Sequence, residues 1–215
     1  MNAGLSNLAT LKGYVLAAAL RSATDYDAAL AAIGLGVAGA FEKYCNRKFA
    51  RVVGATEIFS ADRCQFLISR MPVESVATME VKQTEALGWV VQNPSPIVTL
   101  DSLAGIIYLP DRSDAGIYTT QVRFTFTGGY FWEQLESGDG GYPTAQPNGA
   151  TPIPPDLQFA WLMQCAEVWK KKDKLGQGIT GGEEKTERIN PANLQQKFLP
   201  EVESILAQYI RYSMT

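Results

Sequence analysis

Few residues of this chain have the types and spacing that catalysis or metal binding requires. Histidine is absent, and this removes the general base of Ser-His-Asp and Cys-His sites together with the commonest transition-metal ligand. The three cysteines, Cys45, Cys64 and Cys165, stand far apart and include no CxxC pair. They predict neither a zinc site nor a disulfide framework, and we interpret them as buried free thiols in a reducing cytoplasm. No two carboxylates stand out as an acid–base pair, so we expect no enzyme, no cofactor and no metal.

One glycine motif could indicate a dinucleotide-binding site. Gly34, Gly36 and Gly39 match the GxGxxG pattern of dinucleotide-binding sites. Such a site requires the motif directly after a strand, where the phosphates meet the N-terminus of a helix. Here alanines precede the glycines within a helical pattern. We therefore interpret the glycines as positions that let a neighbouring helix approach closely.

The one basic cluster has two interpretations. Lys170, Lys171, Lys172 and Lys174 follow a helical pattern, where they complement the negative end of the helix dipole and aid solubility. Alternatively, they form a basic patch near passing DNA or an acidic partner. The net charge of −3 and a pI of about 5.1 give no general attraction to nucleic acid or acidic membranes. Sequence-specific DNA binding is not expected.

Composition indicates an ordinary globular protein without a membrane segment. Of the 215 residues, 46% are hydrophobic and 19% are charged, values that argue against global disorder. The start of the chain lacks the pattern of a signal peptide. Its longest apolar stretches are interrupted by glycine, arginine or lysine, and we expect them to fall short of a membrane span.

The elements that position these residues fall into three blocks. Apolar residues recur at helical spacing in the first and last parts of the chain, whereas short β-branched and aromatic runs fill the middle. We therefore predict one mainly α domain over 1–215, a small helical bundle with a β-rich insertion between its second and third helices and a C-terminal amphipathic helix. The predicted segments are helices over 5–49, a β-rich insert over 50–128, a long loop over 129–155, a helix over 156–175, a mobile loop over 176–197 and a helix over 198–212.

Within these segments we expect a first helix capped by Thr10 and a second helix over about 26–44. The best strand signal covers 121–127, where Val122, Phe124 and Phe126 share one face. The last helix carries Arg211 in its last turn.

Two apolar sets are candidates for contacts with other molecules. The long loop carries aromatic residues that are unusual in a linker, and they indicate a segment that docks on its own domain or on a neighbour; they are Tyr130, Phe131, Trp132 and Tyr142. The final helix carries an apolar stripe that either packs in its own core or anchors the chain on a partner; its candidates are Phe198, Leu199, Val202, Ile205, Leu206, Tyr209 and Tyr212.

The order of several short segments resembles the head–tail connector (adaptor) proteins of tailed bacteriophages. Segments 8–15 and 42–49 resemble the opening helix and the end of the second helix of that family. Segment 66–76 resembles its strand entry, with an apolar residue followed by Pro-Val-x-Ser-Val. Segments 122–130 and 155–169 resemble its last strand and its Trp-bearing third helix. The strand region and the Gly/Pro-rich stretch 137–152 are longer here than in the short family members.

The resemblance implies a structural protein of the virion neck, assembled in the cytoplasm of a bacterial host. Many copies, a dodecamer, form a closed ring that joins the portal of the DNA-filled head to the tail and extends the DNA channel. The implied partners are further copies of the chain, the portal, a tail or stopper protein, and passing DNA without sequence specificity. The final helix is then the anchor on portal or neighbour, the aromatic loop a partner contact, and the lysines face the lumen.

Three other functions remain open at this point. A tail-completion or stopper protein of the same neck region is usually dominated by a β-barrel. A small enzyme requires a deep pocket with converging ionisable groups. A nucleic-acid-binding module requires tight, salt-dependent binding of DNA.

Overall fold

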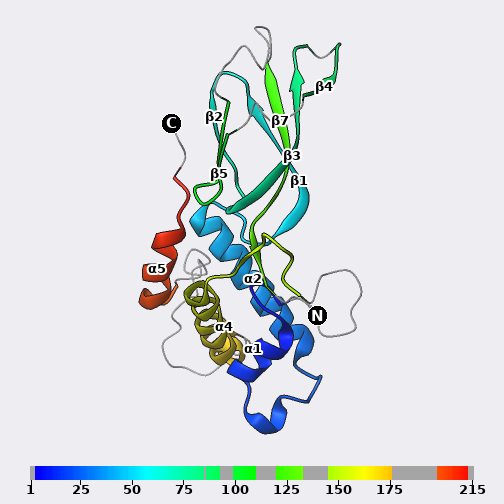
Figure 1. Ribbon diagram of the computed structural model, residues 1–215. Helices are drawn as coiled ribbons and strands as arrows, with labels where there is room; N and C mark the ends of the chain where they lie inside the picture. The colour runs from blue at the N-terminus through cyan, green and yellow to red at the C-terminus, as the bar shows by residue number, and fades with distance from the viewer. Residues whose placement is uncertain are drawn as a thin grey trace. The chain divides into compact units, whose positions relative to one another are not determined.

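The computed structural model describes residues 3–84, 86–92, 99–109, 120–132, 145–175 and 198–212. Its helices are α1 (Leu8–Val15), η1 (Ala18–Leu20), α2 (Asp27–Cys45), α4 (Pro155–Leu175), α5 (Pro200–Leu206) and η4 (Ala207–Tyr209) (Figure 1). Its strands are β1 (Val52–Ser60), β2 (Gln65–Leu67), β3 (Val73–Lys82), β4 (Trp89–Gln92), β5 (Thr99–Asp101), β6 (Ile106–Tyr108), β7 (Gln121–Gly128), β8 (Tyr130–Phe131) and β9 (Thr151–Pro152).

The prediction of a mainly α fold is wrong. Helix accounts for 37% and strand for 31% of the structure. The strands between residues 52 and 128 pair into sheets of four and three strands, and these sheets enclose a hydrophobic core of their own. A segment that buries a hydrophobic core of its own is a structural unit rather than an insertion, because burial of apolar side chains is the main favourable term in folding.

The chain divides into two compact units. The helical unit comprises Met1–Cys45, Trp132–Ala145 and Ile153–Ile210, and the β unit comprises Asn46–Phe131, Gln146–Pro152 and Arg211–Thr215. The predicted mobile loop, 176–197, and positions 133–144 of the predicted long loop lie outside the described residues.

In the helical unit, α2 and α4 approach closely at one glycine. The indole Nε1 of Trp161, a fully buried residue, donates a hydrogen bond to the carbonyl oxygen of Gly34 at 2.9 Å. A Cβ atom on Gly34 would lie 2.0 Å from the carbonyl oxygen of Ala3 and 2.9 Å from the Trp161 ring. The motif glycines therefore lie inside a helix, and Gly34 is a packing position, whereas Gly36 and Gly39 face open space.

The ends of the helices differ from their predicted positions. Helix α1 begins at Leu8 because the side chain of Asn7 accepts a hydrogen bond from the Thr10 amide at 2.8 Å, so that Asn7 and not Thr10 is the N-cap. The chain then leaves the α-helix at Leu16 and forms the short helix η1. At the other end of the chain, α5 continues only as the 3-10 turn η4, and Ile210 is already extended.

Helix α2 is long and apolar enough to cross a membrane by length and composition alone. The expectation that every apolar stretch falls short of a span is therefore wrong for this helix by that measure. A core helix satisfies the same measure, and α2 has fully buried side chains at Leu30, Val37 and Phe41. It packs against α1, α4 and α5 in its own unit, which accounts for its apolar residues.

In the β unit, two antiparallel sheets share one core. The larger sheet has the order β1-β7-β3-β4 and the smaller one β2-β6-β5 (Figure 1). Strand β7 has the predicted alternation, with Val122, Phe124 and Phe126 fully buried and the residues between them half-buried. Met79 of β3 pairs opposite Phe124, and the smaller sheet contributes its own buried side chains to this core; they are Phe66 and Ile107, continued by Ile68 and Leu109.

The other face of the larger sheet carries an ion pair under an aromatic ring. Arg123 of β7 donates from Nε and Nη2 to the two carboxylate oxygens of Glu80 on β3, both at 2.6 Å. The Trp89 ring lies over the guanidinium, 4.5 Å from Cζ to the ring centroid. These hydrogen bonds from Arg123 hold the pKa of Glu80 below its ordinary value of 4.5.

We expect Gly34→Ala to destabilise the protein by about 1–3 kcal/mol, the usual cost of an overpacked core position. The added methyl group would meet the Ala3 carbonyl and the Trp161 ring. Gly36→Ala is the matched control in the same helix, because a Cβ there meets nothing within 4 Å. It should stabilise the protein by up to about 1 kcal/mol through helix propensity. Urea unfolding of both variants measures the difference, and equal free energies would contradict the close packing.

We expect Glu80→Gln to destabilise the protein at neutral pH and to have little effect at low pH. A carboxyl group whose pKa is lowered in the folded state contributes stability above its ordinary pKa of 4.5 and loses it as the pH falls through the lowered value. Thermal unfolding between pH 7 and pH 2 tests this. In an Arg123→Gln background the pH-dependent difference should vanish, and its persistence there would assign it to another partner.

Candidate interaction surfaces

Among the described residues, no three His, Cys, Asp or Glu side chains lie close enough together to hold a metal ion. All three cysteines are free thiols, with Cys45 and Cys165 buried, whereas Cys64 is exposed, contrary to the interpretation that all are buried. Burial raises the pKa of the Cys165 thiol, which leaves it protonated and unreactive. The candidate sites predicted from the sequence are surfaces.

Three of the seven residues of the final apolar stripe lie in the core of the helical unit. Val202 and Leu206 are fully buried, and Phe198 is only 8% exposed. The Phe198 ring packs edge-on against Phe41 at 5.3 Å and against Tyr44 at 5.4 Å between ring centroids. These contacts join the start of the last helix to α2, and they explain why an apolar stripe appears in the sequence.

Polar contacts fix the same segment to α4. The amide of Leu199 donates to the side-chain oxygen of Gln164 at 3.1 Å, and the Tyr209 hydroxyl donates to the Asp156 carboxylate at 2.8 Å. Leu199, Ile205 and Tyr209 are half-buried, while Tyr212 is 76% exposed. A contact of this set with another molecule depends on its exposed part, above all on Tyr212, and stays a prediction.

The aromatic residues of the predicted loop are docked on their own chain where the structure describes them. Tyr130 and Phe131 form β8, which pairs in parallel with β9. The Tyr130 amide donates to the Phe49 carbonyl at 2.7 Å, and the Arg47 guanidinium lies 5.3 Å from the Tyr130 ring centroid. Phe131 and Trp132 are buried, and Tyr142 lies outside the described residues. Their role as a partner contact remains a prediction.

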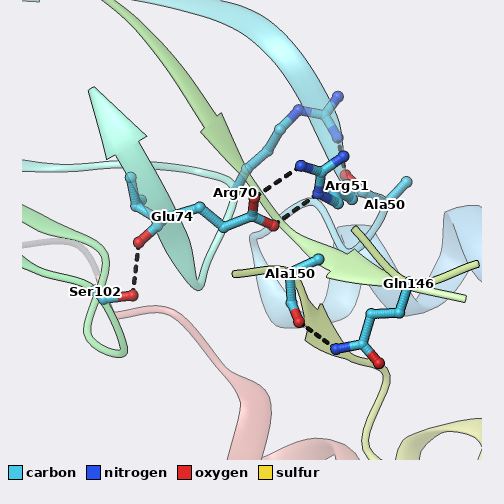
Figure 2. A network of polar contacts seen from close by, with 8 residues as sticks. Ala50, Arg51, Arg70, Glu74, Ser102, Gln146 and Ala150 are labelled. Atoms are coloured by element: carbon cyan, nitrogen blue, oxygen red, sulfur yellow. Dashed lines mark hydrogen bonds and ion pairs between the residues drawn. The ribbon is translucent and has the colours of Figure 1, made fainter. Parts of the chain in front are cut away.

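A polar network holds the chain around the start of β1 (Figure 2). Arg51 donates to both carboxylate oxygens of Glu74, from Nε at 2.7 Å and from Nη2 at 2.8 Å. Arg70 donates to the Ala50 carbonyl at 2.6 Å, and the Gln146 amide nitrogen donates to the Ala150 carbonyl. The bonds of Arg51 and Arg70 join residues 23 and 20 positions apart in the sequence, whereas the bond of Gln146 is local. The bond from Arg70 holds Ala50, which pairs with Tyr130 in an isolated β-bridge.

The basic cluster lies at the end of α4. Lys170 and Lys171 are exposed, and Lys171 forms an ion pair with Glu167 one turn earlier, at 2.8 Å. The side chains of Lys172 and Lys174 lie outside the described residues. The positions agree with both interpretations of the cluster, dipole complementation and a surface near DNA.

Two hollows were not predicted from the sequence. In the helical unit, a groove of about 370 Å³ runs between α1 and α4 beside Leu199, with Tyr14, Met163 and Trp169 among its lining residues. In the β unit, a pocket of about 380 Å³ lies between β1 and β2, and Arg211 lines it. The sequence pattern placed Arg211 in the last turn of a helix, and no local signal indicates that it reaches a strand edge instead.

Of the comparisons with known proteins, only the one with solved structures gives a match, and it shows the fold alone. No protein-family model matches the chain, and no curated protein matches it. The structure is similar to a chain from the neck of an empty GTA particle computed with C6 symmetry. The similarity covers 97% of this chain and 90% of the other, with a TM-score of 0.55 and 12% sequence identity. The two chains share a fold.

We expect Phe198→Ala to destabilise the protein by about 3–5 kcal/mol, because it removes a buried ring from between Phe41 and Tyr44. Tyr212→Ala, at a side chain that is 76% exposed, should change the free energy of unfolding by less than about 0.5 kcal/mol. Urea unfolding followed by circular dichroism compares the two variants. A neutral Phe198→Ala would return Phe198 to the candidates for an intermolecular anchor.

Proposed function

We propose that this protein is a structural component of the neck of a tailed phage or related particle, where copies form a closed ring between portal and tail. The observation that carries the proposal is the fold shared with a chain from the neck of a GTA particle along 97% of this chain. The resemblance of segments 8–15, 42–49, 66–76 and 122–130 to head–tail connectors supports it from the sequence.

A ring is the assembly that one chain type forms when its contacts join two different surfaces and the rotation closes. The similar chain comes from a neck computed with C6 symmetry, and a dodecamer is compatible with that symmetry. Each copy then meets its neighbours through exposed surfaces. The contact with the portal uses the exposed end of the final segment, where Tyr212 is 76% exposed.

The chemistry of the chain suits a mechanical role. An overall charge of −3 gives weak net attraction to DNA, so a channel lined by such copies lets DNA slide. Lys170 and Lys171 are exposed and supply local positive charge without sequence recognition. A ring interior that proves strongly positive would argue against this view of the channel.

A stopper or tail-completion protein of the same neck region is the second candidate. The observation in its favour is the β unit, whose two sheets enclose a separate core. Against it stands the helical unit, because such proteins are dominated by strand, whereas helix here makes up 37% and strand 31%.

The first test is the mass of the purified protein, alone and mixed with the portal protein of the same particle, by light scattering and negative-stain microscopy. We expect a ring, or a monomer that becomes a ring on the portal. A monomer that ignores the portal but binds the tail-side protein would favour the stopper. A monomer that binds neither would contradict the neck assignment.

Point substitutions, rather than a deletion, should locate the portal contact. Deletion of the residues after Asn193 would remove the candidate anchor, but it would also remove Phe198, Val202 and Leu206 from the core. Tyr212→Ala should weaken portal binding by about tenfold or more, the usual effect of removing an aromatic anchor. Leu103→Ala is the matched control, because Leu103 is 80% exposed in the turn between β5 and β6. Equal affinities of the two variants would exclude Tyr212 as the anchor.

A further inference from the structure

The β unit has an opening between two strand edges. Strands β1 and β2 each lie at the edge of their sheet, and neither pairs with another strand on its outer side within the described residues. A pocket of about 380 Å³ lies between them. It is lined by three consecutive residues of each edge, and we call these residues the seam: Ile58, Phe59, Ser60, Gln65, Phe66 and Leu67.

Hydrogen bonds close one end of the seam, and two phenylalanine rings close its core side. At Glu57, next to the seam on β1, the carboxylate accepts hydrogen bonds from the amide of Ser69 at 3.1 Å and from its hydroxyl at 2.5 Å. The rings of Phe59 and Phe66 contact each other with 5.4 Å between centroids and belong to the core cluster or pack against it. The opening therefore runs along the strand edges from Ile58 toward the turn that joins β1 to β2.

Arg211 lies in this opening with incomplete hydrogen bonding. Its Nη2 donates to the carbonyl oxygen of Leu67 at 2.6 Å, and its Nε is buried and has no acceptor within the described residues. Burial lowers the pKa of the guanidinium, while the charge of Glu57 raises it and that of Arg47 lowers it. A buried N–H without an acceptor is costly, so an acceptor entering the seam would be stabilised there.

The charged residues that line the seam pocket are positive in excess, because Arg63 and Arg211 stand there with one carboxylate, Asp62. The charges of Glu57 and Arg47 also act on Arg211, with opposite signs. The Asp62 carboxylate lies 3.9 Å from the guanidinium of Arg63 on the rim. The whole chain has a net charge of −3, so the seam is a positive site on an acidic protein. Such a site favours a negatively charged ligand.

We propose that the seam binds an extended segment of another protein, which adds a strand to the edge of β1 and directs a carboxylate to Arg211. The backbone of the segment pairs with the free edge of Ile58–Ser60, the mode by which sheet edges bind peptides. β1 rather than β2 receives the strand, because Arg211 already occupies the Leu67 carbonyl on β2.

The described strands of a second copy are not the source of that segment. Every carboxylate on a described strand already has a partner. Glu57 accepts from Ser69, Glu74 from Arg51, and Glu80 from Arg123. Asp101 accepts from the amide of Ala104. None of these strands would therefore bring a free carboxylate, and we assign the segment to a different protein of the particle. Only this last step rests on the proposed neck function.

The test is hydrogen–deuterium exchange of the full chain with a short synthetic peptide of alternating threonine and valine carrying one central glutamate. A control peptide of the same sequence carries glutamine in place of the glutamate. We expect the glutamate peptide at millimolar concentration to slow exchange in segment 58–60, because added strand pairing protects edge amides. The glutamine peptide should bind about tenfold more weakly. The peptides need no ring and no portal, so their result does not depend on the proposed function.

Two variants separate the charge of Arg211 from a structural effect. Arg211→Gln should abolish the difference between the two peptides, and Arg211→Lys should retain part of it. Arg21→Gln is the matched control, since Arg21 in the helical unit also donates to a backbone carbonyl, that of Leu16 at 3.3 Å. Its peptide binding should be unchanged. Thermal unfolding followed by circular dichroism verifies that each variant is folded.

Three outcomes would overturn the proposal. The first is the absence of protection in segment 58–60 with either peptide. The second is equal protection by the glutamate and glutamine peptides, which would show that the carboxylate does not contribute to binding. The third is protection that rises with the concentration of the protein alone, which would identify a second copy as the occupant.

Discussion

The β unit depends on one strand that is paired on both sides. β7 forms ladders with β1 and with β3, and its residues Val122, Phe124 and Phe126 are fully buried. More than 60 residues separate β7 from the start of β1, so these ladders close a long loop and carry its entropic cost. Because β7 takes the inner side of β1, the outer side of β1 becomes a sheet edge. The seam is therefore a consequence of the pairing that forms the core.

In the helical unit, a single glycine allows two helices to pack closely around a buried tryptophan. Trp161 needs a hydrogen-bond acceptor for its indole N–H, since a buried donor without one is costly. The Gly34 carbonyl supplies it at 2.9 Å, and the missing side chain leaves room for Ala3 beside it. The glycine that resembled part of a nucleotide motif thus serves the contact between α2 and α4.

The specific polar interactions of the chain stabilise its fold, and its surfaces remain available for association. Arg51 and Arg123 each form a two-pronged ion pair inside the β unit, and such pairs fix strands more than they create reactivity. Arg211 differs from them, because a backbone carbonyl is its acceptor and no carboxylate among the described residues forms an ion pair with it. The polar groups that the structure describes thus serve the fold, which agrees with the proposed role of the protein in a particle neck.

Local patterns in the sequence determined where most elements lie. The alternation of Val122, Phe124 and Phe126 placed a strand, and the helical spacing of residues 26–44 placed α2 within one residue at each end, because both periods follow from backbone geometry. Only the tertiary structure decided that the strands form a separate unit, that Phe198 is core and that Arg211 reaches a strand edge. Those outcomes depend on which distant segments pair and bury each other, and such contacts leave no period in the sequence.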